Sequence, residues 1–427
     1  MISLASLGSL ILVWTVPSQE PSLNLRETRK LVEEFFALDS LSESDSLRRM
    51  EIVSRLDSIT LDSSSKKSRW RKDLLKAASK RAQLTKKAGE YWTWEEEQRG
   101  RFIIGGETKR PKALLISFHG GGLGSANARN SFNFHHKAAK ELKWLAIFPQ
   151  ALEATEYGWT DSGTEEWVLN LMESALRTWD IPSQKVYFAG HSMGGYGSWV
   201  LGGHHADRLA AAAPSAGAPT PVYNYQEELI DIQSGVIPNL RNLPMVVFQS
   251  RDDPKVPPDV NQFAVQCVLE AQKKWGGYSD FTYWEVDGVG HGSPPGGPIA
   301  HLQKIKDFSR TSFPLEVMWQ PALSWKRRWY WLYWYQPQLE QNLFVRADPK
   351  TNSIFVESKK KPQGLQIFLP PQLFSLKKEL TVFFNKNKIW KGMAEPTLGS
   401  LLLSSTYGDS QMILDSRISP FGSTPDH

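Results

Sequence analysis

The chain has 427 residues, enough for one large domain with additions or for two or three domains of ordinary size. Its 50 lysine and arginine residues barely exceed its 45 aspartate and glutamate residues, which argues against nucleic-acid recognition as the main task. A single cysteine, Cys267, excludes an intramolecular disulfide and a multi-cysteine zinc site, while 41% apolar residues provide for a substantial core.

The longest apolar stretch lies at the beginning of the sequence. Ile2 to Val16 carry no charge, have about the length of the apolar part of a signal peptide, and are followed by the breaker Pro17. We therefore expect residues 1–20 to be an export signal and the protein to be secreted or periplasmic. An uncleaved anchor and a buried N-terminal segment are the alternatives. No later stretch approaches ~18 consecutive apolar residues, so no integral membrane domain is expected after signal removal.

Residues 21–99 are predicted to form a helical extension. Apolar residues recur at helical spacing at Leu31, Phe35 and Leu38 and again at Leu47, Ile52 and Leu56, and a third helix is expected from about residue 68. Lysine and arginine are concentrated between residues 62 and 90. Such a run is usually a solvated helix face, and the alternative is a surface that docks on anions.

Residues 100–320 have the pattern of an α/β domain with a doubly wound, mostly parallel sheet. Short apolar runs alternate with glycine-rich turns and with helical stretches, for example at 165–179 and 259–274. The ligand site of such a sheet lies at the carboxyl ends of its strands, so functional residues should directly follow strands. The expected strands are 113–118, 144–148, 185–189, 209–213, 245–248 and 281–286.

Residues 321–427 are predicted to form a small β-rich domain, an antiparallel β-sandwich. Its strand-like segments are 353–357, 365–369, 380–384 and 412–414, with a turn signal at 385–388. An aromatic and basic run from Trp325 to Tyr335 opens this module. The run fits a buried hinge strand between domains, and it also fits a surface that stacks on carbohydrate.

A candidate nucleophile follows the third expected strand of the sheet. The strand continues into Gly190-His191-Ser192-Met193-Gly194, a G-x-S-x-G sequence, and then into a helix. A serine on so tight a strand-to-helix turn needs small residues two positions before and after it, because bulkier ones would collide. The hydroxyl of Ser192 is then exposed above the sheet.

A glycine-rich segment, His119-Gly120-Gly121-Gly122, follows the first strand of the predicted sheet. Unobstructed N–H groups of Gly121, Gly122 and Met193 would form an oxyanion hole, each typically stabilising the negative charge of acyl transfer by ~3 kcal/mol. Taken alone, the glycines equally fit a turn that only reverses the chain.

Two further strands end in loops that carry an acid and a histidine. Asp253 follows strand 245–248 and is preferred to Asp252, and His291 follows strand 281–286. A neutral imidazole takes the serine proton and returns it to the leaving group when a carboxylate fixes its orientation. Ser192, Asp253 and His291 are thus predicted to form a catalytic triad. The adjacent histidines at 135–136 and 204–205 have no acidic cluster with them, so no metal site is expected.

These motifs and their chain order resemble the α/β-hydrolase superfamily over roughly residues 100–309, half of the chain. Within the superfamily, the chain resembles the secreted esterase branch at three segments, Phe148-Pro149-Gln150, Gly158-Trp159-Thr160 and Trp179-Asp180-Ile181. That branch contains feruloyl esterases, acetylxylan esterases and polyhydroxyalkanoate depolymerases, and it borders the prolyl-oligopeptidase-like group. The resemblance implies a serine hydrolase that needs no cofactor. The helical extension, the C-terminal module and the glycine-rich oxyanion segment depart from that branch and leave the substrate open.

Three further residues are candidates for substrate binding. Trp159 is a possible pocket wall, His191 adjoins the nucleophile, and Glu165 follows the second strand closely enough to face the site. Glu165 also fits the start of the next helix, where acidic residues are common, and this capping interpretation is favoured.

The sequence thus predicts a hydrolase of carboxylic esters that acts through an acyl-enzyme on a small-molecule or glycan-linked ester. A serine peptidase with the same triad is the nearest alternative, because ester and amide cleavage share the nucleophile and the oxyanion site. The other alternative is a binding protein. Its C-terminal module would dock on carbohydrate, or its basic helices on an anionic surface, and the hydrolase domain would be secondary.

Overall fold

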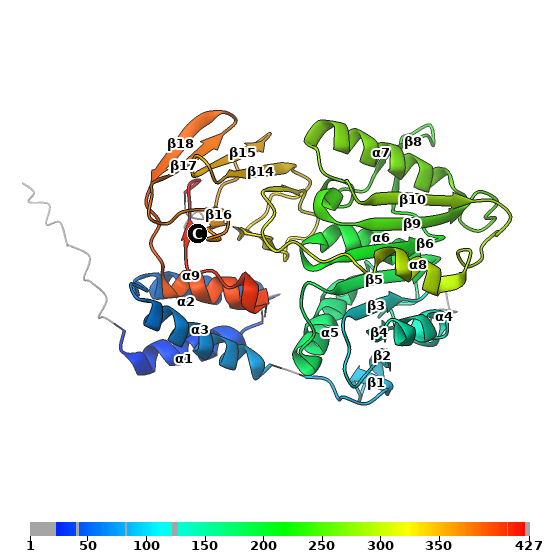
Figure 1. Cartoon of the computed structure of the whole chain (residues 1–427), viewed down its shortest axis with the longest axis horizontal. Helices are drawn as coiled ribbons and strands as arrows, with labels where there is room; N and C mark the ends of the chain where they lie inside the picture. The colour runs from blue at the N-terminus through cyan, green and yellow to red at the C-terminus, as the bar shows by residue number, and fades with distance from the viewer. Residues whose placement is uncertain (1–22, 40–41, 82, 122–126, 408, 423–427) are drawn as a thin grey trace, which may run out of the picture.

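The computed structural model describes residues 23–39, 42–81, 83–121, 127–407 and 409–422, which form two lobes (Figure 1). One lobe contains a large sheet with its helices, and the other contains the N-terminal helices and the C-terminal strands. The predicted export signal, residues 1–20, lies outside the described residues. Within the described ranges, no helix combines the length and the apolar character needed to cross a membrane.

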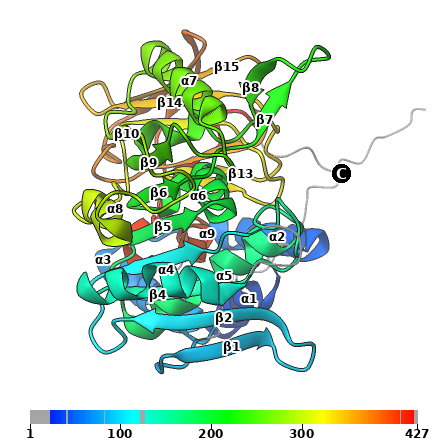
Figure 2. The ribbon, with the colours of Figure 1, turned by 90° about the vertical axis from the view of Figure 1, so that its right-hand side faces the viewer.

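The large sheet is doubly wound and mostly parallel. Its strands are β1 (Gly89–Trp94), β2 (Arg99–Gly106), β3 (Leu114–Phe118), β4 (Leu145–Pro149), β5 (Val186–His191), β6 (Ala211–Ser215), β9 (Met245–Ser250) and β10 (Phe281–Val286). They follow the order β1-β2-β4-β3-β5-β6-β9-β10, and Figure 2 shows the sheet between its edge strands β1 and β10. The pairs β1–β2 and β2–β4 are antiparallel, and the later pairs are parallel. This is the α/β-hydrolase fold.

All the strands predicted for this sheet are present, and two more precede them. β1 and β2 lie inside or across the boundary of the predicted helical extension, so the sheet begins at Gly89 and not near residue 100. β1 is the edge strand and is partly exposed along its length. It therefore lacks the continuous apolar run by which the inner strands are recognised in the sequence.

Helices cover both faces of the sheet because its inner strands are apolar on both. In β3, Leu114 and Ile116 pack on one face, and Leu115, between them, packs on the other. The first face is covered by α5 (Thr164–Trp179), α6 (Met193–His204) and α7 (Asp259–Trp275), and the second by α4 (Ala128–Glu141) and α8 (Gly297–Ile305). Strand ends and the loops that follow them are thereby held rigidly at one rim.

The N-terminal helices belong to the same lobe as the C-terminal strands. They are α1 (Leu25–Ala37), α2 (Glu43–Asp57) and α3 (Ser64–Ser79), and α2 lies beside the C-terminal helix α9 (Leu398–Ser404) (Figure 1). The Leu61 N–H donates to the Pro396 carbonyl at 2.8 Å, and Arg417 forms an ion pair with Asp57. The predicted extension is therefore part of a second lobe built from both ends of the chain.

Two sheets form the rest of this lobe, where the sequence predicted an antiparallel sandwich over residues 321–427; β11 lies before that range, and one strand pair is parallel. One has the order β11-β14-β15-β17-β18 and the other the order β12-β13-β16-β19. Their bounds are β11 (Glu316–Trp319), β12 (Arg328–Trp329), β13 (Leu332–Trp334), β14 (Leu343–Asp348), β15 (Ser353–Ser358), β16 (Leu365–Phe368), β17 (Leu380–Phe384), β18 (Asn387–Gly392) and β19 (Arg417–Ile418). Every pair is antiparallel except β15–β17. The predicted turn after β17 is present, with positive φ at Asn385 and Lys386.

The strand predicted at residues 412–414 is absent. Ser410–Met412 form a short 3-10 turn instead. The Ser404 hydroxyl accepts a hydrogen bond from the Leu414 N–H at 2.7 Å and donates one to the Leu414 carbonyl at 2.8 Å. A side chain thus satisfies the backbone groups that a neighbouring strand would otherwise pair.

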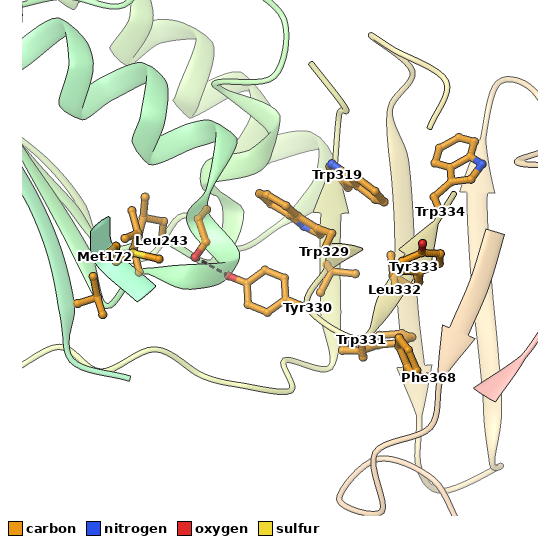
Figure 3. Packing of buried hydrophobic residues seen from close by; sticks show 14 of the residues in the cluster. Met172, Leu243, Trp319, Trp329, Tyr330, Trp331, Leu332, Tyr333, Trp334 and Phe368 are labelled. Carbon is orange, nitrogen blue, oxygen red and sulfur yellow. Dashed lines mark hydrogen bonds between the residues drawn. The ribbon is translucent and has the colours of Figure 1, made fainter. Parts of the chain in front are cut away.

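The aromatic run after Trp325 is a buried hinge between the lobes, as one of its two interpretations predicted. Its enclosed residues include Trp329, Tyr330, Trp331 and Trp334. Figure 3 shows Tyr330 pointing from this cluster toward the hydrolase lobe, where its hydroxyl donates to the Ala206 carbonyl at 3.3 Å. Lys326 forms a buried ion pair with Asp207 at 2.7 Å. Because these tryptophan faces are covered by protein, they are not open to stacking on a sugar.

Candidate active site

Ser192 lies on the sharp turn between β5 and α6, as the G-x-S-x-G sequence predicted. Its backbone has φ 60° and ψ −125°, an uncommon conformation for a residue with a side chain. A Cβ on Gly190 would lie 2.2 Å from the Gly194 carbonyl oxygen, and a Cβ on Gly194 would lie 2.2 Å from that of Phe118. The two glycines therefore permit the close contact of β5, α6 and β3 that holds the serine in place.

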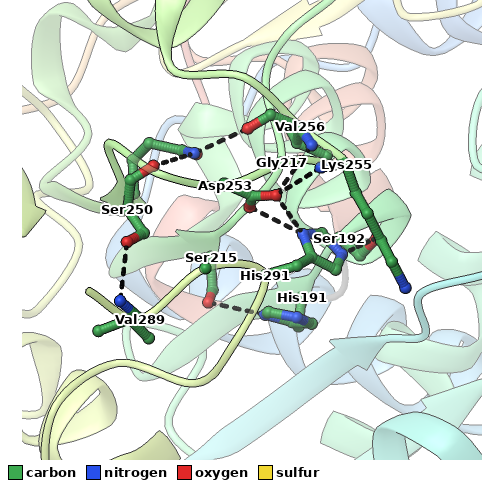
Figure 4. A network of polar contacts seen from close by, with 12 residues as sticks. His191, Ser192, Ser215, Gly217, Ser250, Asp253, Lys255, Val256, Val289 and His291 are labelled. Atoms are coloured by element: carbon green, nitrogen blue, oxygen red, sulfur yellow. Dashed lines mark hydrogen bonds and ion pairs between the residues drawn. The ribbon is translucent and has the colours of Figure 1, made fainter. Parts of the chain in front are cut away.

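The structure brings the three predicted triad residues together (Figure 4). The Ser192 hydroxyl oxygen lies 2.9 Å from Nε2 of His291, and Nδ1 of His291 lies 2.8 Å from Oδ2 and 3.0 Å from Oδ1 of Asp253. The Asp253 side chain is fully buried, and its Oδ1 accepts hydrogen bonds from the Lys255 and Val256 N–H groups at 2.9 and 3.0 Å. A proton on Nδ1 shared with this carboxylate leaves Nε2 as the acceptor for the serine proton.

The neighbouring acid, Asp252, holds the loop that carries His291. Its Oδ1 accepts hydrogen bonds from the Gly288 and Gly290 N–H groups, each at 3.1 Å, and from the Ser250 hydroxyl. The Ser250 hydrogen bond, followed by that of Gly290, holds the pKa of the Asp252 carboxyl below its ordinary value. Sequence reasoning treated Asp252 only as a rival of Asp253 and missed this role.

Two of the three predicted oxyanion donors can be placed. Met193 is the first residue of α6, and among the described residues its N–H has no acceptor, as expected for the first turn of a helix. Gly121 lines the same cavity as Ser192 and has φ 108°, a backbone conformation that favours glycine. Gly122 lies outside the described residues.

His119 fixes the loop that carries these glycines, a role that the sequence did not reveal. Its Nε2 accepts the Ala151 N–H at 3.0 Å, and its carbonyl accepts the indole N–H of Trp159 at 3.2 Å. Burial lowers the pKa of His119 to about 4, so the ring is neutral near pH 7. The loop after β3 is thereby tied to the loop after β4.

Ser192 and His291 open into a cavity of about 730 Å³. His191, predicted to bind substrate, also lines it: the ring stacks on Phe134, and Nδ1 lies 3.1 Å from the Ser215 hydroxyl. Burial, with a smaller effect of His291, lowers the pKa of His191 to about 4. The remaining wall consists of Phe118, Gly120, Gly121, Asn130, Ser131, Glu156, Lys255 and Val256.

Trp159 and Glu165, also predicted to contact substrate, lie elsewhere. Trp159 is fully buried. Glu165 is buried at the start of α5, where its carboxylate contacts His204 at 2.7 Å and His205 at 3.3 Å. Glu165 lies in the first turn of α5, where the favoured interpretation placed it, although the N-cap, Gly163, makes no side-chain hydrogen bond. The sequence could not show which side of α5 faces the interior at its first turn.

The other histidine pair serves the fold. Nδ1 of His135 lies 2.8 Å from the Ser117 hydroxyl, and Nδ1 of His136 accepts the Gly106 N–H at 3.1 Å. Within the described ranges, no group of three or more histidine, cysteine, aspartate or glutamate side chains is arranged to hold a metal ion.

Neither a protein-family model nor a curated protein sequence matches this chain. Among solved structures, a thermostable esterase is 19% identical with a TM-score of 0.39, covering 52% of this chain and 63% of its own. An acetyl xylan esterase from Aspergillus awamori is 10% identical with a TM-score of 0.35, covering 46% and 90%. A ferulic acid esterase from Anaeromyces mucronatus is 15% identical with a TM-score of 0.36, covering 52% and 88%. Likeness this distant carries no information on the substrate.

Proposed function

We propose that this protein is a serine hydrolase that cleaves carboxylic esters through an acyl-enzyme. The observation that carries the proposal is the hydrogen-bonded chain from Ser192 through His291 to the buried carboxylate of Asp253. These side chains come from the ends of three different strands and meet at a cavity that a substrate can enter. A nucleophile, a base within hydrogen-bonding reach and a group that orients the base are the parts that acyl transfer requires.

In the proposed mechanism, the Ser192 oxygen attacks the ester carbonyl while Nε2 of His291 takes the hydroxyl proton. Asp253 keeps the ring oriented and stabilises the imidazolium. The negative charge that develops on the carbonyl oxygen is held by the N–H groups of Met193 and Gly121, with the N-terminus of α6 adding its dipole. The alcohol leaves with the proton from His291. A water molecule, activated by the same ring, then releases the acid and restores Ser192.

The cavity suits an ester with an apolar acyl group and a hydroxylated alcohol. Phe118, Phe134 and Val256 give it apolar surface, and polar groups are supplied by Asn130, Glu156 and Lys255. Esters are favoured over amides because an alcohol leaves more readily and requires less exact protonation of the leaving group. The apolar residues 2–16 support export, which would place the enzyme where glycan-linked and other extracellular esters occur.

The test compares hydrolysis of p-nitrophenyl acetate and of the matching acetyl anilide by the wild type and by Ser192→Ala. We expect ester turnover well above amide turnover, and a loss of at least ~10⁴-fold in kcat on removal of the hydroxyl. Ser279→Ala, at an exposed position, is the control and should be unaffected. Ester turnover retained by a folded Ser192→Ala would end the proposal, and faster anilide cleavage would favour the peptidase alternative.

A further inference from the structure

A second cavity, of about 300 Å³, lies between the two lobes. Helices α1 and α2 contribute to it from the N-terminal segment, α5 from the hydrolase lobe, and residues 325–328 from the hinge. It shares no lining residue with the cavity at Ser192. The function proposed above leaves it without a role.

Positive charge dominates the wall of this interlobe cavity. Six cationic side chains line it against three acidic ones, Asp39, Glu166 and Glu173. Glu173 already forms ion pairs with two of the cations, Arg208 at 3.2 Å and Arg81 at 3.6 Å. The cationic residues are Arg49, Arg81, Arg208, Lys326, Arg327 and Arg328.

Arg49 differs from the other cations of the cavity. Within the described part of the chain it has neither a hydrogen bond nor an ion pair, and its guanidinium carbon lies over the ring of Phe35 at 4.3 Å. Burial, with the nearby charges of Arg81 and Arg327, lowers the pKa of Arg49 to about 10, against smaller opposing effects of Tyr333 and Asp39. The guanidinium is therefore a charged group whose in-plane N–H donors remain unused.

Much of the rest of the wall is apolar, beside the polar residues Ser46, Asn170 and Thr406. Phe36, Leu38, Met50, Leu169 and Leu403 contribute to it, together with the ring of Tyr333. A ligand that fills this space must therefore bury carbon as well as satisfy a guanidinium. Inorganic anions can pair with the guanidinium but have no apolar part to bury.

We propose that the interlobe cavity binds an amphipathic organic anion, a carboxylate or a phosphate monoester held by Arg49 with its apolar body among the surrounding side chains. Both groups accept two parallel N–H bonds from one guanidinium. The bound anion contacts both lobes at once. Because it binds the folded chain, it stabilises that state by RT ln(1 + L/Kd), where L is its free concentration.

The experiment measures the thermal unfolding midpoint and the calorimetric Kd of the full chain with phenyl phosphate and with 4-phenylbutyrate. Inorganic phosphate and benzyl alcohol are the probes that carry only the charge or only the apolar body. We expect saturable binding of at least one amphipathic anion, at least tenfold tighter than either control probe. The two anions distinguish a phosphate ligand from a carboxylate ligand.

Variants locate the binding. Arg49→Gln should raise the Kd at least tenfold. Arg55→Gln, which removes an equal charge from an exposed position of α2, should not change it, and neither should Lys255→Gln in the cavity at Ser192. If Arg49→Gln does not fold, Arg49→Lys is the alternative. It keeps the charge but loses the paired N–H donors of the guanidinium, so it should still weaken binding. The proposal would be overturned if no saturable binding is seen or if inorganic phosphate binds equally tightly. It would also be overturned if the Kd is unchanged in both Arg49 variants, or if Lys255→Gln loses binding. Ester hydrolysis by Arg49→Gln is expected to match the wild type, so the two proposals fail separately.

Discussion

The adjacent carboxylates of Asp252 and Asp253, which follow β9, have different structural roles. Asp253 is buried and contacts the His291 ring, while Asp252 holds the backbone of the loop on which that ring is carried. Sequence position alone does not separate the two, since each follows the same strand. The backbone groups that they contact distinguish the two, because the N–H groups of Lys255 and Val256 hold only Asp253 in place.

We predict that Asp253→Asn lowers kcat for a p-nitrophenyl ester by ~10³ to 10⁴, because the amide no longer orients the ring or stabilises the imidazolium. Asp252→Asn is the matched variant. It keeps the shape but weakens the hydrogen bonds that hold the loop, so its loss is expected to be about tenfold. Steady-state kinetics give kcat for both variants and so compare the two losses. Equal losses would contradict the separate roles.

At the residue scale, the sequence was sufficient for the side chains whose position follows from a strand end. Ser192, Asp253 and His291 each follow an apolar run, and the structure brings them within hydrogen-bonding distance. Trp159 and Glu165 were misplaced because both turn into the protein interior. Glu165 contacts His204 and His205, and Trp159 packs against Phe118 and Gly197. No local pattern encodes these long-range contacts.

Among the secondary-structure elements, the turn between β5 and α6 requires glycine at Gly194, at the beginning of the helix. Gly194 and Gly202 lie on the same helix, yet only the first is surrounded closely. A Cβ on Gly194 would meet the Phe118 carbonyl at 2.2 Å, whereas one on Gly202 would meet the flexible end of Met245 at 3.4 Å. Of these two glycines, the first is required and the second is replaceable.

We predict that Gly194→Ala abolishes ester hydrolysis and lowers the free energy of unfolding, because β3 must move away from α6. Gly202→Ala should retain activity and change stability by no more than about 1 kcal/mol, the difference in helix propensity. Urea unfolding and ester turnover of the two variants measure this. A Gly194→Ala protein with wild-type activity would show that the turn tolerates a side chain.

Sequence patterns predicted elements well where one apolar face or run determines them. The inner strands of the sheet are of this kind, while the hairpin turn at Asn385 was predicted from its own polar turn residues. The edge strand β1 and the segment at 412–414 are not, because one is half exposed and the other is paired by the Ser404 side chain. Their structures depend on neighbours that are remote in the sequence.

At the scale of the whole molecule, a buried ion pair joins the lobes. Lys326 and Asp207 contact at 2.7 Å with side chains 9% and 0% exposed, while Lys391 and Glu379 contact at the same distance with side chains about half exposed. Burial lowers the pKa of Lys326, so its charge depends on Asp207. The two pairs differ in environment and not in geometry.

We predict that Lys326→Met destabilises the protein by ~3 to 5 kcal/mol, because it leaves the Asp207 carboxylate buried without its cation. Lys391→Met should cost no more than ~1 kcal/mol, since water solvates Glu379 after the change. Urea unfolding of both variants at neutral pH gives the comparison. Similar small losses would indicate that the lobes do not rely on the buried pair.

Buried neutral histidines make stability depend on pH. Burial lowers the pKa of His119, His205 and His301 to about 4 and that of His135 to about 3, from an unfolded value of 6.5. Between these values the unfolded chain binds protons that the folded chain does not, so the stability present above pH 6.5 is lost as the pH falls toward 4. Each such histidine contributes up to about 1.4 kcal/mol per pH unit in this window.

We predict that the urea midpoint falls steeply between pH 6.5 and 4.5 and is nearly flat from pH 7 to 8. His301→Gln should reduce the slope, because one of the groups that titrates only on unfolding is removed. A midpoint that rises on acidification would contradict the assignment of neutral, buried rings.

Whether Ser192 is an activated nucleophile is tested most directly by the mass of the intact protein after reaction with a serine-directed fluorophosphonate, followed by peptide mapping. We expect a single adduct on Ser192, absent from Ser192→Ala and formed more slowly in Asp253→Asn. A folded wild-type protein that stays unlabelled, or one labelled at another residue, would contradict this expectation.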